Sequence, residues 1–527
     1  MNTCCSFASQ KISIYNKLVV FMGVCLMGLR GMLLLWFLVG GVVQANPLAL
    51  RRSVFRIETT GQDRNFVNPW RLRSPDMISG TGFYIGDGRI LTNAHVVANA
   101  SSITIQRDGD SRHMPAFVQH IGHDVDLAIL GVADPNYLKN VEALVLGSVP
   151  RLRSPVTTVG YPMGGDQVSM TDGVVNRISY RTYVHSDADD HLLVQVDSAI
   201  NPGNSGGPVF QGRNVVGVAF QAISRAQGAG FIIPVPVVQR FLTDCEDGQY
   251  DGVPDWGVET QDFVLNNRAS ARFYQVPTGE RRGVIVSRVF SWSPAAGVFQ
   301  RGDVLMSVSG RDIGVDGKVA FEGERVDFEA LYDLRLVGDR VRFELLRDGV
   351  IREVTVQAGH GKPHQYSGLI YSKRPRFTVF SGIVFTALTR SVMEIWGDGW
   401  EKRAPLLLRY LLKNPFDIPG VEDREEVVII SDILTNKDNS FLKVQSPVVD
   451  KVNGKTVTSV KMLHETLMAI QNGTLRVDFM FDEDPWILDA AALKSSHEDT
   501  NRRYGVSPPF WLEPYSVDGA ITKVGVK

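Results

Sequence analysis

The segment Asn201–Pro208, with the sequence NPGNSGGP, holds the residues of this chain best suited to chemistry. Its glycines and prolines fix a bend around Ser205 that neither a helix nor a strand tolerates. Consecutive N–H groups in such a bend turn inward beside the hydroxyl, which suits acyl transfer. We expect Ser205 to be the nucleophile and the turn Gly203-Asn204-Ser205 to form the oxyanion hole, through the N–H groups of its first and last residues. The two glycines after the serine leave room for a substrate backbone; the alternative is an ordinary glycine-rich surface turn.

A serine hydroxyl needs a neighbouring base to act as a nucleophile. His95, in GRILTNAHVV, follows an apolar strand and lies between small residues, which makes it the candidate base. Asp126, in HDVDLAILGV, precedes an apolar strand that would carry its carboxylate inward to orient the imidazole. Asp124 is the competing carboxylate, but its position beside His123 favours a solvated turn.

The order His95, Asp126, Ser205 is that of chymotrypsin-like double barrels, and it differs from the orders in subtilisin and the α/β-hydrolases. Residues 52–240 agree, because short β-branched runs closed by Gly, Asp or Pro recur about every ten residues, as in an all-β barrel or sandwich. The expected strands include Gly82–Ile85, Ile103–Gln106, Ala128–Leu130, Val156–Val159, Leu192–Val196, Val215–Phe220 and Phe231–Ile233.

A repeat follows from about residue 255. The segments DVLMSVSGRDI (303–313) and PVVDKVNGKTV (447–457) share a pattern, and each precedes a helical stretch and a β-rich run. We therefore expect two copies of a small α/β module behind a mainly β domain. The expected helices are Phe328–Leu336 and Val460–Ile470, and the expected strands are Val341–Leu346 and Leu475–Phe481.

These patterns divide the 527 residues, a length that suits roughly three to four domains. The expected organisation is a leader (1–45), a protease domain (48–245), a first module (255–358), a linker (359–375), a second module (376–485), and a C-terminal helix and tail (486–527), the helix at Ile487–Ser495.

The leader resembles an export signal. Residues 27–45 combine Arg30, the apolar run MLLLWFLVGGVV and small residues before a cleavage point after Ala45, so translation from Met27 would give a compact signal peptide. The alternative is an uncleaved membrane anchor at Leu18–Val43. Cleavage would leave Cys245 as the one cysteine of the mature chain, so no internal disulfide is expected.

Composition argues against several partners. A net charge of −2 and a pI of about 6.6 disfavour nucleic acid. No His/Cys cluster has zinc spacing, and Gly454-Lys455-Thr456 lacks the leading glycine of a phosphate loop. We expect neither a metal nor a cofactor.

The motifs TNAHVV, DVDLAIL and NPGNSGGPVF resemble those of the Deg/HtrA family of serine endoproteases, and the repeats resemble its PDZ domains. The segments 159–177 (VGYPMGGDQVSMTDGVVNR) and 380–385 (FSGIVF) are similar to the plant-type branch, which pairs one ordinary PDZ domain with a divergent one. The resemblance covers about residues 50–485. It implies His95, Asp126 and Ser205 as the catalytic triad, ATP-independent proteolysis, oligomers built from trimers, and often holdase activity.

Substrate selection is expected to depend on the residues around the serine. Trypsin-like enzymes select basic substrates with a carboxylate six residues before the serine, where this chain has Ala199, followed by Ile200. The pocket should then take a small or medium aliphatic side chain, with Val218-Ala219-Phe220 pairing with the substrate and helping to line it. Asn204 cannot form the ion pair that activates chymotrypsin-like zymogens, so a loop rearrangement is expected instead.

The resemblance assigns the control elements. Residues 178–190 resemble the family's sensor loop, with Arg181 as a candidate relay, and residues 221–229 resemble the loop that borders the pocket. Trp256-Gly257-Val258 and Ser381-Gly382-Ile383 stand where the family has its PDZ carboxylate loops. The second module departs through an insertion at 386–426 with a helix-like Arg403–Leu412, which favours packing between subunits.

The sequence thus predicts an exported, ATP-independent serine endopeptidase that acts on misfolded or unfolded proteins, forms homo-oligomers (trimers or hexamers) and binds exposed C-termini. A bacterial envelope is the expected location, with an organelle or membrane-anchored form as the alternative. Two other functions remain open: a chaperone-like holdase scaffold, and a membrane-tethered regulatory protease with one dedicated substrate.

Overall fold

The computed structural model describes residues 50–162, 165, 167–222, 230–262, 264–277, 283–360, 368–397, 399–414, 424–443, 446–481 and 484–513. The chain divides into two units, 1–49 and 50–527. The leader, most of the pocket-bordering loop at 221–229 and the tail after residue 513 lie outside the described residues. None of the described helices is long and apolar enough to span a membrane.

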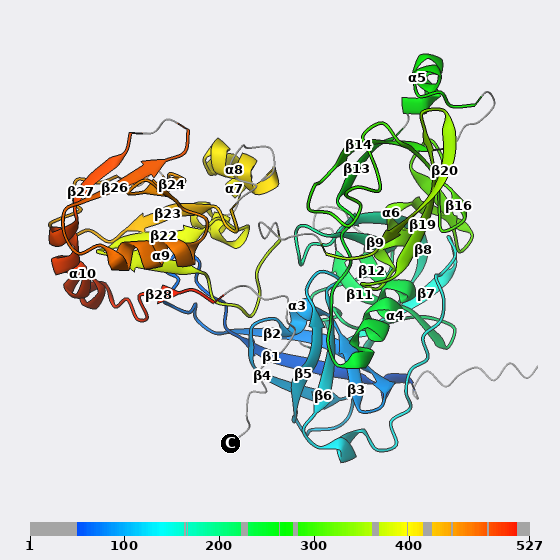
Figure 1. Ribbon diagram of the computed structural model, residues 1–527. Coiled ribbons are helices and arrows are strands. Elements are labelled where there is room, and N and C mark those ends of the chain that lie inside the picture. Colours follow the sequence, from blue (N-terminus) through cyan, green and yellow to red (C-terminus); the bar gives the residue numbers. More distant parts are fainter. Residues whose placement is uncertain are drawn as a thin grey trace, which may run out of the picture. The chain divides into compact units, whose positions relative to one another are not determined.

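The first β-barrel is closed and antiparallel, with the strand order β1-β2-β3-β6-β5-β4 (Figure 1). Its strands are β1 (Val54–Gly61), β2 (Asp76–Gly86), β3 (Arg89–Thr92), β4 (Ala100–Arg107), β5 (Met114–Gly122) and β6 (Leu127–Val132), with a short helix α3 (Ala94–Val97) after β3 and a 3₁₀ turn η1 (Pro135–Leu138) after β6.

Strand β6 explains why its sequence is apolar throughout. Ala128 and Leu130 fill the interior of the first barrel, whereas Leu127 and Ile129 on the other face pack into a second, larger core. A strand buried on both faces needs continuous apolar residues. Asp126, directly before β6, is therefore held in a fully buried position.

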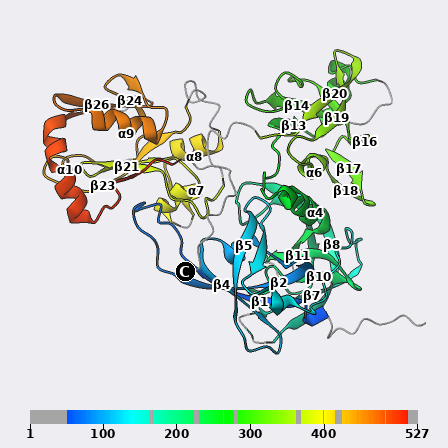
Figure 2. The same cartoon turned by 60° about the horizontal axis from the view of Figure 1, so that its bottom comes forward.

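The second barrel is also closed, with the order β10-β11-β12-β9-β8-β7 (Figures 1 and 2). Its strands are β7 (Pro155–Gly160), β8 (Ser169–Thr182), β9 (Asp190–Val196), β10 (Pro208–Gln211), β11 (Asn214–Ala222) and β12 (Gly230–Pro234), followed by helix α4 (Val235–Asp244) and the 3₁₀ turn η3 (Cys245–Asp247).

The first α/β module forms a sheet of order β13-β14-β15-β19-β20, with β16 paired to β15 and a separate hairpin β17-β18. The elements are β13 (Val258–Gln261), η4 (Val264–Asn266), α5 (Arg268–Phe273), β14 (Val284–Val289), β15 (Val304–Val308), β16 (Arg311–Asp312), β17 (Lys318–Phe321), β18 (Glu324–Asp327), α6 (Glu329–Asp333), β19 (Arg340–Arg347) and β20 (Val350–Gln357).

The second module has two four-stranded sheets, β23-β22-β21-β28 and β25-β24-β26-β27. The elements are β21 (Phe377–Phe380), β22 (Ile383–Ala387), η5 (Ser391–Trp396), α7 (Trp400–Arg403), α8 (Leu406–Lys413), β23 (Val428–Ile433), β24 (Val449–Val452), β25 (Lys455–Thr456), α9 (Val460–Ala469), β26 (Thr474–Phe479), β27 (Trp486–Asp489), α10 (Ala490–Tyr504) and β28 (Phe510–Trp511).

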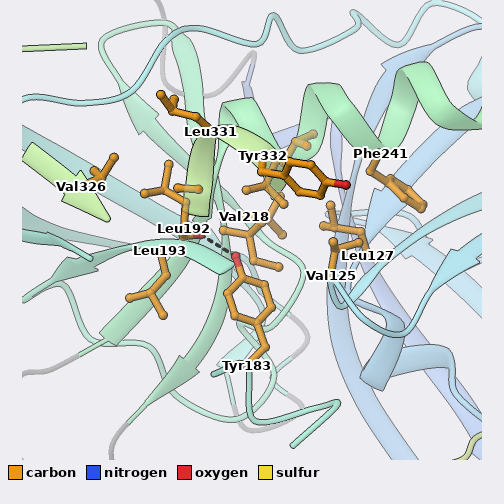
Figure 3. Close-up of a cluster of buried hydrophobic side chains, with 14 of the residues drawn as sticks. Val125, Leu127, Tyr183, Leu192, Leu193, Val218, Phe241, Val326, Leu331 and Tyr332 are labelled. Atoms are coloured by element: carbon orange, nitrogen blue, oxygen red, sulfur yellow. Dashed lines mark hydrogen bonds between the residues drawn. The ribbon is translucent and has the colours of Figure 1, made fainter. Parts of the chain in front are cut away.

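One buried cluster joins the barrels, α4 and the first module (Figure 3). Val125 and Leu127 come from the first barrel, Leu192 and Val218 from the second, and Leu331 from α6. The loops that carry the candidate site therefore extend from elements that pack against one another in this cluster.

The fold confirms the expected double barrel followed by α/β modules, and two helix predictions are corrected. Residues 487–489 belong to β27, and α10 begins only at Ala490, where Asp489 caps it through N–H donors of Ala491 and Ala492. The expected helix Arg403–Leu412 is two helices, because Pro405 has no N–H and interrupts the backbone pattern between α7 and α8.

Candidate active site

His95 and Asp126 meet at the edge of the first barrel. Strand β3 ends at Thr92, and the short helix α3 then places His95 over the start of β6. His95 Nδ1 lies 2.6 Å from Asp126 Oδ2, and the backbone N–H of His95 donates to Oδ1 at 2.7 Å. The Asn93 side chain donates to the Asp126 carbonyl at 2.9 Å. Both carboxylate oxygens thus face one residue, which fixes the imidazole's orientation.

Each residue of this pair stabilises the charged form of the other. Burial alone would raise the pKa of Asp126, but the neighbouring His95 and His185 and the hydrogen bonds from His95 hold it below its usual value. Burial alone would lower the pKa of His95, but the charge and hydrogen bond of Asp126 raise it. The pair is therefore suited to accept a proton on His95 while Asp126 stays ionised.

Ser205 lies in the turn before β10, and its hydroxyl donates to the carbonyl of Phe220 at 3.3 Å. The Phe220 ring centroid is 6.5 Å from that of His95, so the serine and the imidazole share one neighbour. For Ser205 to act as the predicted nucleophile, its hydroxyl would have to turn from this carbonyl towards His95.

The serine turn is bound to the first barrel through Thr81 of β2. The N–H of Thr81 donates to the Ser205 carbonyl at 2.8 Å, and its hydroxyl donates to the Gly203 carbonyl at 2.6 Å. A Cβ at Gly206 would overlap the Thr81 carbonyl, and one at Gly207 would overlap the Val159 carbonyl. These two glycines therefore allow close backbone packing within the protein.

Within the expected oxyanion turn, the N–H of Asn204 donates to the Asn201 carbonyl at 2.9 Å. Asn204 is buried, and its side-chain amide donates to the Ala199 carbonyl at 3.3 Å. The N–H groups of Gly203 and Ser205 remain the predicted donors to an oxyanion, with Gly203 at a φ of +99° that favours glycine.

The expected pocket residues lie in two places: Ala199 and Ile200 follow β9, and Val218, Ala219 and Phe220 lie on β11. Ala199 is exposed, Ile200 is buried, and a Cβ at Gly230 would come within 2.7 Å of Ile200 Cδ1. Ala219 shares a cluster with Ile200. Val218 instead points into the core of Figure 3, and its backbone is paired with β10 on one side and β12 on the other. Phe220 packs on Tyr183 at 4.7 Å between ring centroids.

Asp124 is an anchor and not the solvated turn residue that the sequence suggested. Its carboxylate accepts hydrogen bonds from the Tyr250 hydroxyl at 2.7 Å and from the Val253 N–H at 3.0 Å. Both donors lie in the segment that leads into the first module.

Arg181, the candidate relay, is exposed on β8. Sequence reasoning missed two buried histidines, His185 in the loop between β8 and β9 and His191 at the start of β9.

His191 links strand β9 to the first module. Its Nδ1 lies 2.9 Å from Asp333 Oδ2 of α6, and its Nε2 lies 3.1 Å from the Asp124 carbonyl. Burial alone would lower the pKa of His191, but Asp333 and other nearby carboxylates raise it to about 9. At neutral pH this is a buried ion pair between the second barrel and α6.

The expected carboxylate loop of the first module has the required backbone but also an internal partner. Gly257 has a φ of +59°, and a Cβ there would overlap Ser293. Its N–H donates to Asp255 Oδ1 at 2.8 Å. Trp256 packs against Phe328 at 5.3 Å between centroids, and Val258 begins β13.

Among the described residues no group of His, Cys, Asp or Glu side chains is arranged to hold a metal ion. Cys245 is a buried free thiol.

Comparison with known proteins gives the site a context. A trypsin-like peptidase domain model matches residues 80–218, and a PDZ domain model matches residues 368–509. The chain is 34% identical over 477 residues to "Protease Do-like 2, chloroplastic" of Arabidopsis thaliana, covering 88% of this chain and 76% of that protein. It is 32% identical over 428 residues to "Protease Do-like 4, mitochondrial" of the same plant, covering 81% and 78%. Among solved structures, "HtrA-type protease AlgW with tripeptide" matches at 25% identity with a TM-score of 0.47, over 59% of this chain and 95% of that one.

Proposed function

Because this chain belongs to the Deg/HtrA family of serine proteases, we propose that it is an ATP-independent endopeptidase that degrades misfolded or unfolded proteins. The observation that carries the proposal is the pairing of His95 with both oxygens of a fully buried Asp126, across from a Ser205 turn that the first barrel holds.

In the proposed reaction His95 accepts the Ser205 proton as the hydroxyl attacks a peptide carbonyl. Asp126 stabilises the resulting imidazolium, and the N–H groups of Gly203 and Ser205 bind the oxyanion. His95 then donates the proton to the leaving amine, and water hydrolyses the acyl-enzyme by the same steps in reverse roles.

The proposed cut site follows small or medium aliphatic residues. Ala199 offers no charge at the pocket, and Ile200 presents an apolar wall against Gly230. Burying an aliphatic side chain in such a pocket contributes about 1.5–3 kcal/mol. A peptide panel checks this, and preferred cleavage after Lys or Arg would refute it.

The proposed partners are exposed C-termini, bound as an added strand along β13, and further copies of the chain.

For location, the named relatives are a chloroplastic and a mitochondrial protein. These relatives make an organelle a stronger proposal than the bacterial envelope, and residues 1–45 are then its targeting leader. N-terminal sequencing of the mature protein tests this, since a start before Asn46 excludes cleavage after Ala45.

The central experiment compares casein degradation by the wild type, Ser205→Ala and the matched control Ser101→Ala, whose serine lies exposed on β4. Loss of the nucleophile should lower the rate by at least about 10⁴-fold, with the control unchanged. Suppression of client aggregation is measured on the same three proteins. Full suppression without any wild-type proteolysis would favour the holdase alternative.

A further inference from the structure

Two histidines that the proposed triad does not use lie directly behind Asp126. His185 Nε2 is 3.9 Å from Asp126 Oδ1 and 2.9 Å from His123 Nδ1. The first distance is too long for a hydrogen bond, so the His185 ring faces the carboxylate as a polar edge. His185 is only 6% exposed and therefore keeps water from this side of Asp126.

Tyr371, from the segment between the two α/β modules, covers both histidines. Its ring stacks on His185 at 4.1 Å between centroids with planes 20° apart, and on His123 at 4.8 Å and 24°. Its hydroxyl donates to the His185 carbonyl at 2.7 Å. One side chain thus fixes both the ring and the backbone of His185.

The segment around Tyr371 is bonded on two sides. The N–H of Leu369 donates to the Ser186 carbonyl at 2.9 Å. The N–H of Ile370 donates to the hydroxyl of Ser391, the first residue of η5, also at 2.9 Å. Arg390, just before η5, pairs with Asp187 at 2.8 Å. Contacts therefore run without a gap from the second module to the loop that carries His185.

Both histidines are neutral at neutral pH. Burial lowers the pKa of His123 to about 3 and that of His185 to about 4, despite the attraction of Asp126 and Asp124. Neither ring can therefore replace His95 as a base that cycles its charge during turnover. Their contribution to Asp126 is packing and the exclusion of water.

We propose that His185 is a positioning residue for the Asp126–His95 pair and that Tyr371 holds the His185 ring in place. Docking of residues 368–371 on residues 185–187, which we call the lock, then sets the rate of acyl transfer. Without Tyr371, water reaches Asp126 and the imidazole loses its fixed orientation. The backbone of β11 that would bind substrate is not part of the lock, so the effect falls on kcat and not on KM. This inference rests on the proposed triad but not on the proposed substrate class.

The test measures casein-derived peptide hydrolysis by full-length Tyr371→Leu, Tyr371→Phe and the control Tyr274→Leu, whose tyrosine packs in a separate cluster of the first module. Tyr371→Leu should lose about 10- to 100-fold in kcat with KM unchanged, because small displacements of catalytic groups have effects of that size. Tyr371→Phe keeps the stacking and should recover to within about threefold of wild type. The control should match wild type.

A second variant avoids removing buried volume. Asp187 has a φ of +57°, which Asn also tolerates, and its side chain is 45% exposed, so Asp187→Asn should fold normally. It should lower kcat about twofold and slow the reaction of Ser205 with a fluorophosphonate to the same extent. An unchanged kcat in folded Tyr371→Leu, or a rise in KM alone, would overturn the lock. Persisting activity in Ser205→Ala would instead overturn the triad itself.

Discussion

The two α/β modules repeat one pattern but differ at the strand that follows the expected carboxylate loop. In the first module, β13 pairs with β14 alone and forms the edge of the described sheet. In the second, the corresponding β22 pairs with β23 on one side and with β21 on the other. The edge that would accept a peptide strand in the first module is therefore already occupied in the second.

The turn between β21 and β22 is closed as well. Ser381 is fully buried, and its N–H donates to His497 Nδ1 of α10 at 3.0 Å. Its carbonyl accepts from the side chains of Asn436 and Asn439, both at 2.9 Å. An unpaired sheet edge can capture an extended peptide, whereas a paired edge cannot. One sequence pattern thus yields a candidate binding module and a module suited to structural contacts.

The largest effect is expected from breaking a buried ion pair within the second module. Arg376, next to β21, pairs with Glu426, whose other oxygen accepts from the N–H of Val460 at the start of α9. Glu426→Gln removes the negative charge that faces the buried Arg376 guanidinium and should lower the free energy of unfolding of this module by about 3–5 kcal/mol. Urea denaturation measures this. Asp499→Asn, at an exposed pair with Arg503, is the control and should cost less than about 1 kcal/mol.

The next prediction compares how much the turns at Gly257 and Gly382 contribute to peptide binding. Gly257→Val should weaken binding of a peptide with a free C-terminal carboxylate at least about tenfold, because the side chain overlaps Ser293 and the loop must shift. Gly382→Val overlaps the Leu434 carbonyl and should leave that affinity unchanged. Fluorescence anisotropy with the free and the amidated peptide measures both. Equal losses in the two variants would mean that both modules bind.

The last effect is a pH dependence that comes from one carboxyl group of the first module. Burial, with Asp327 and Asp262 nearby, raises the pKa of Glu329 on α6 to about 8. The folded module then holds a proton that the unfolded chain releases near pH 4.5, so its stability should fall as pH rises from about 4.5 to about 8. Glu329→Gln should flatten this slope without changing the second module. Thermal melts at several pH values test it, and a slope that survives the substitution would assign it to another group.

The sequence was most informative where function depends on residues next to one another in the chain. His95 after β3 and Asp126 before β6 could be placed because an apolar strand fixes the direction of the residue that borders it. The glycines around Ser205 were recognised, but their packing partners were not, since Thr81 lies more than a hundred residues away.

Long-range contacts explain the remaining misses. The anchoring of Asp124 depends on Tyr250, and the stack on His185 depends on Tyr371, which is 186 residues distant. No local pattern marks such partners. Ile487 and Leu488 have apolar side chains compatible with a helix, and pairing with β26 decides in favour of a strand.

The attachment of the Ser205 turn to Thr81 has a consequence for when the candidate site forms during folding. His95 and Asp126 come from one barrel and Ser205 from the other, and the serine backbone is held by hydrogen bonds that exist only when the two barrels have joined. A chain that is still being synthesised or threaded through a membrane has no assembled nucleophile. Assembly of the candidate triad is therefore coupled to the joining of the two barrels.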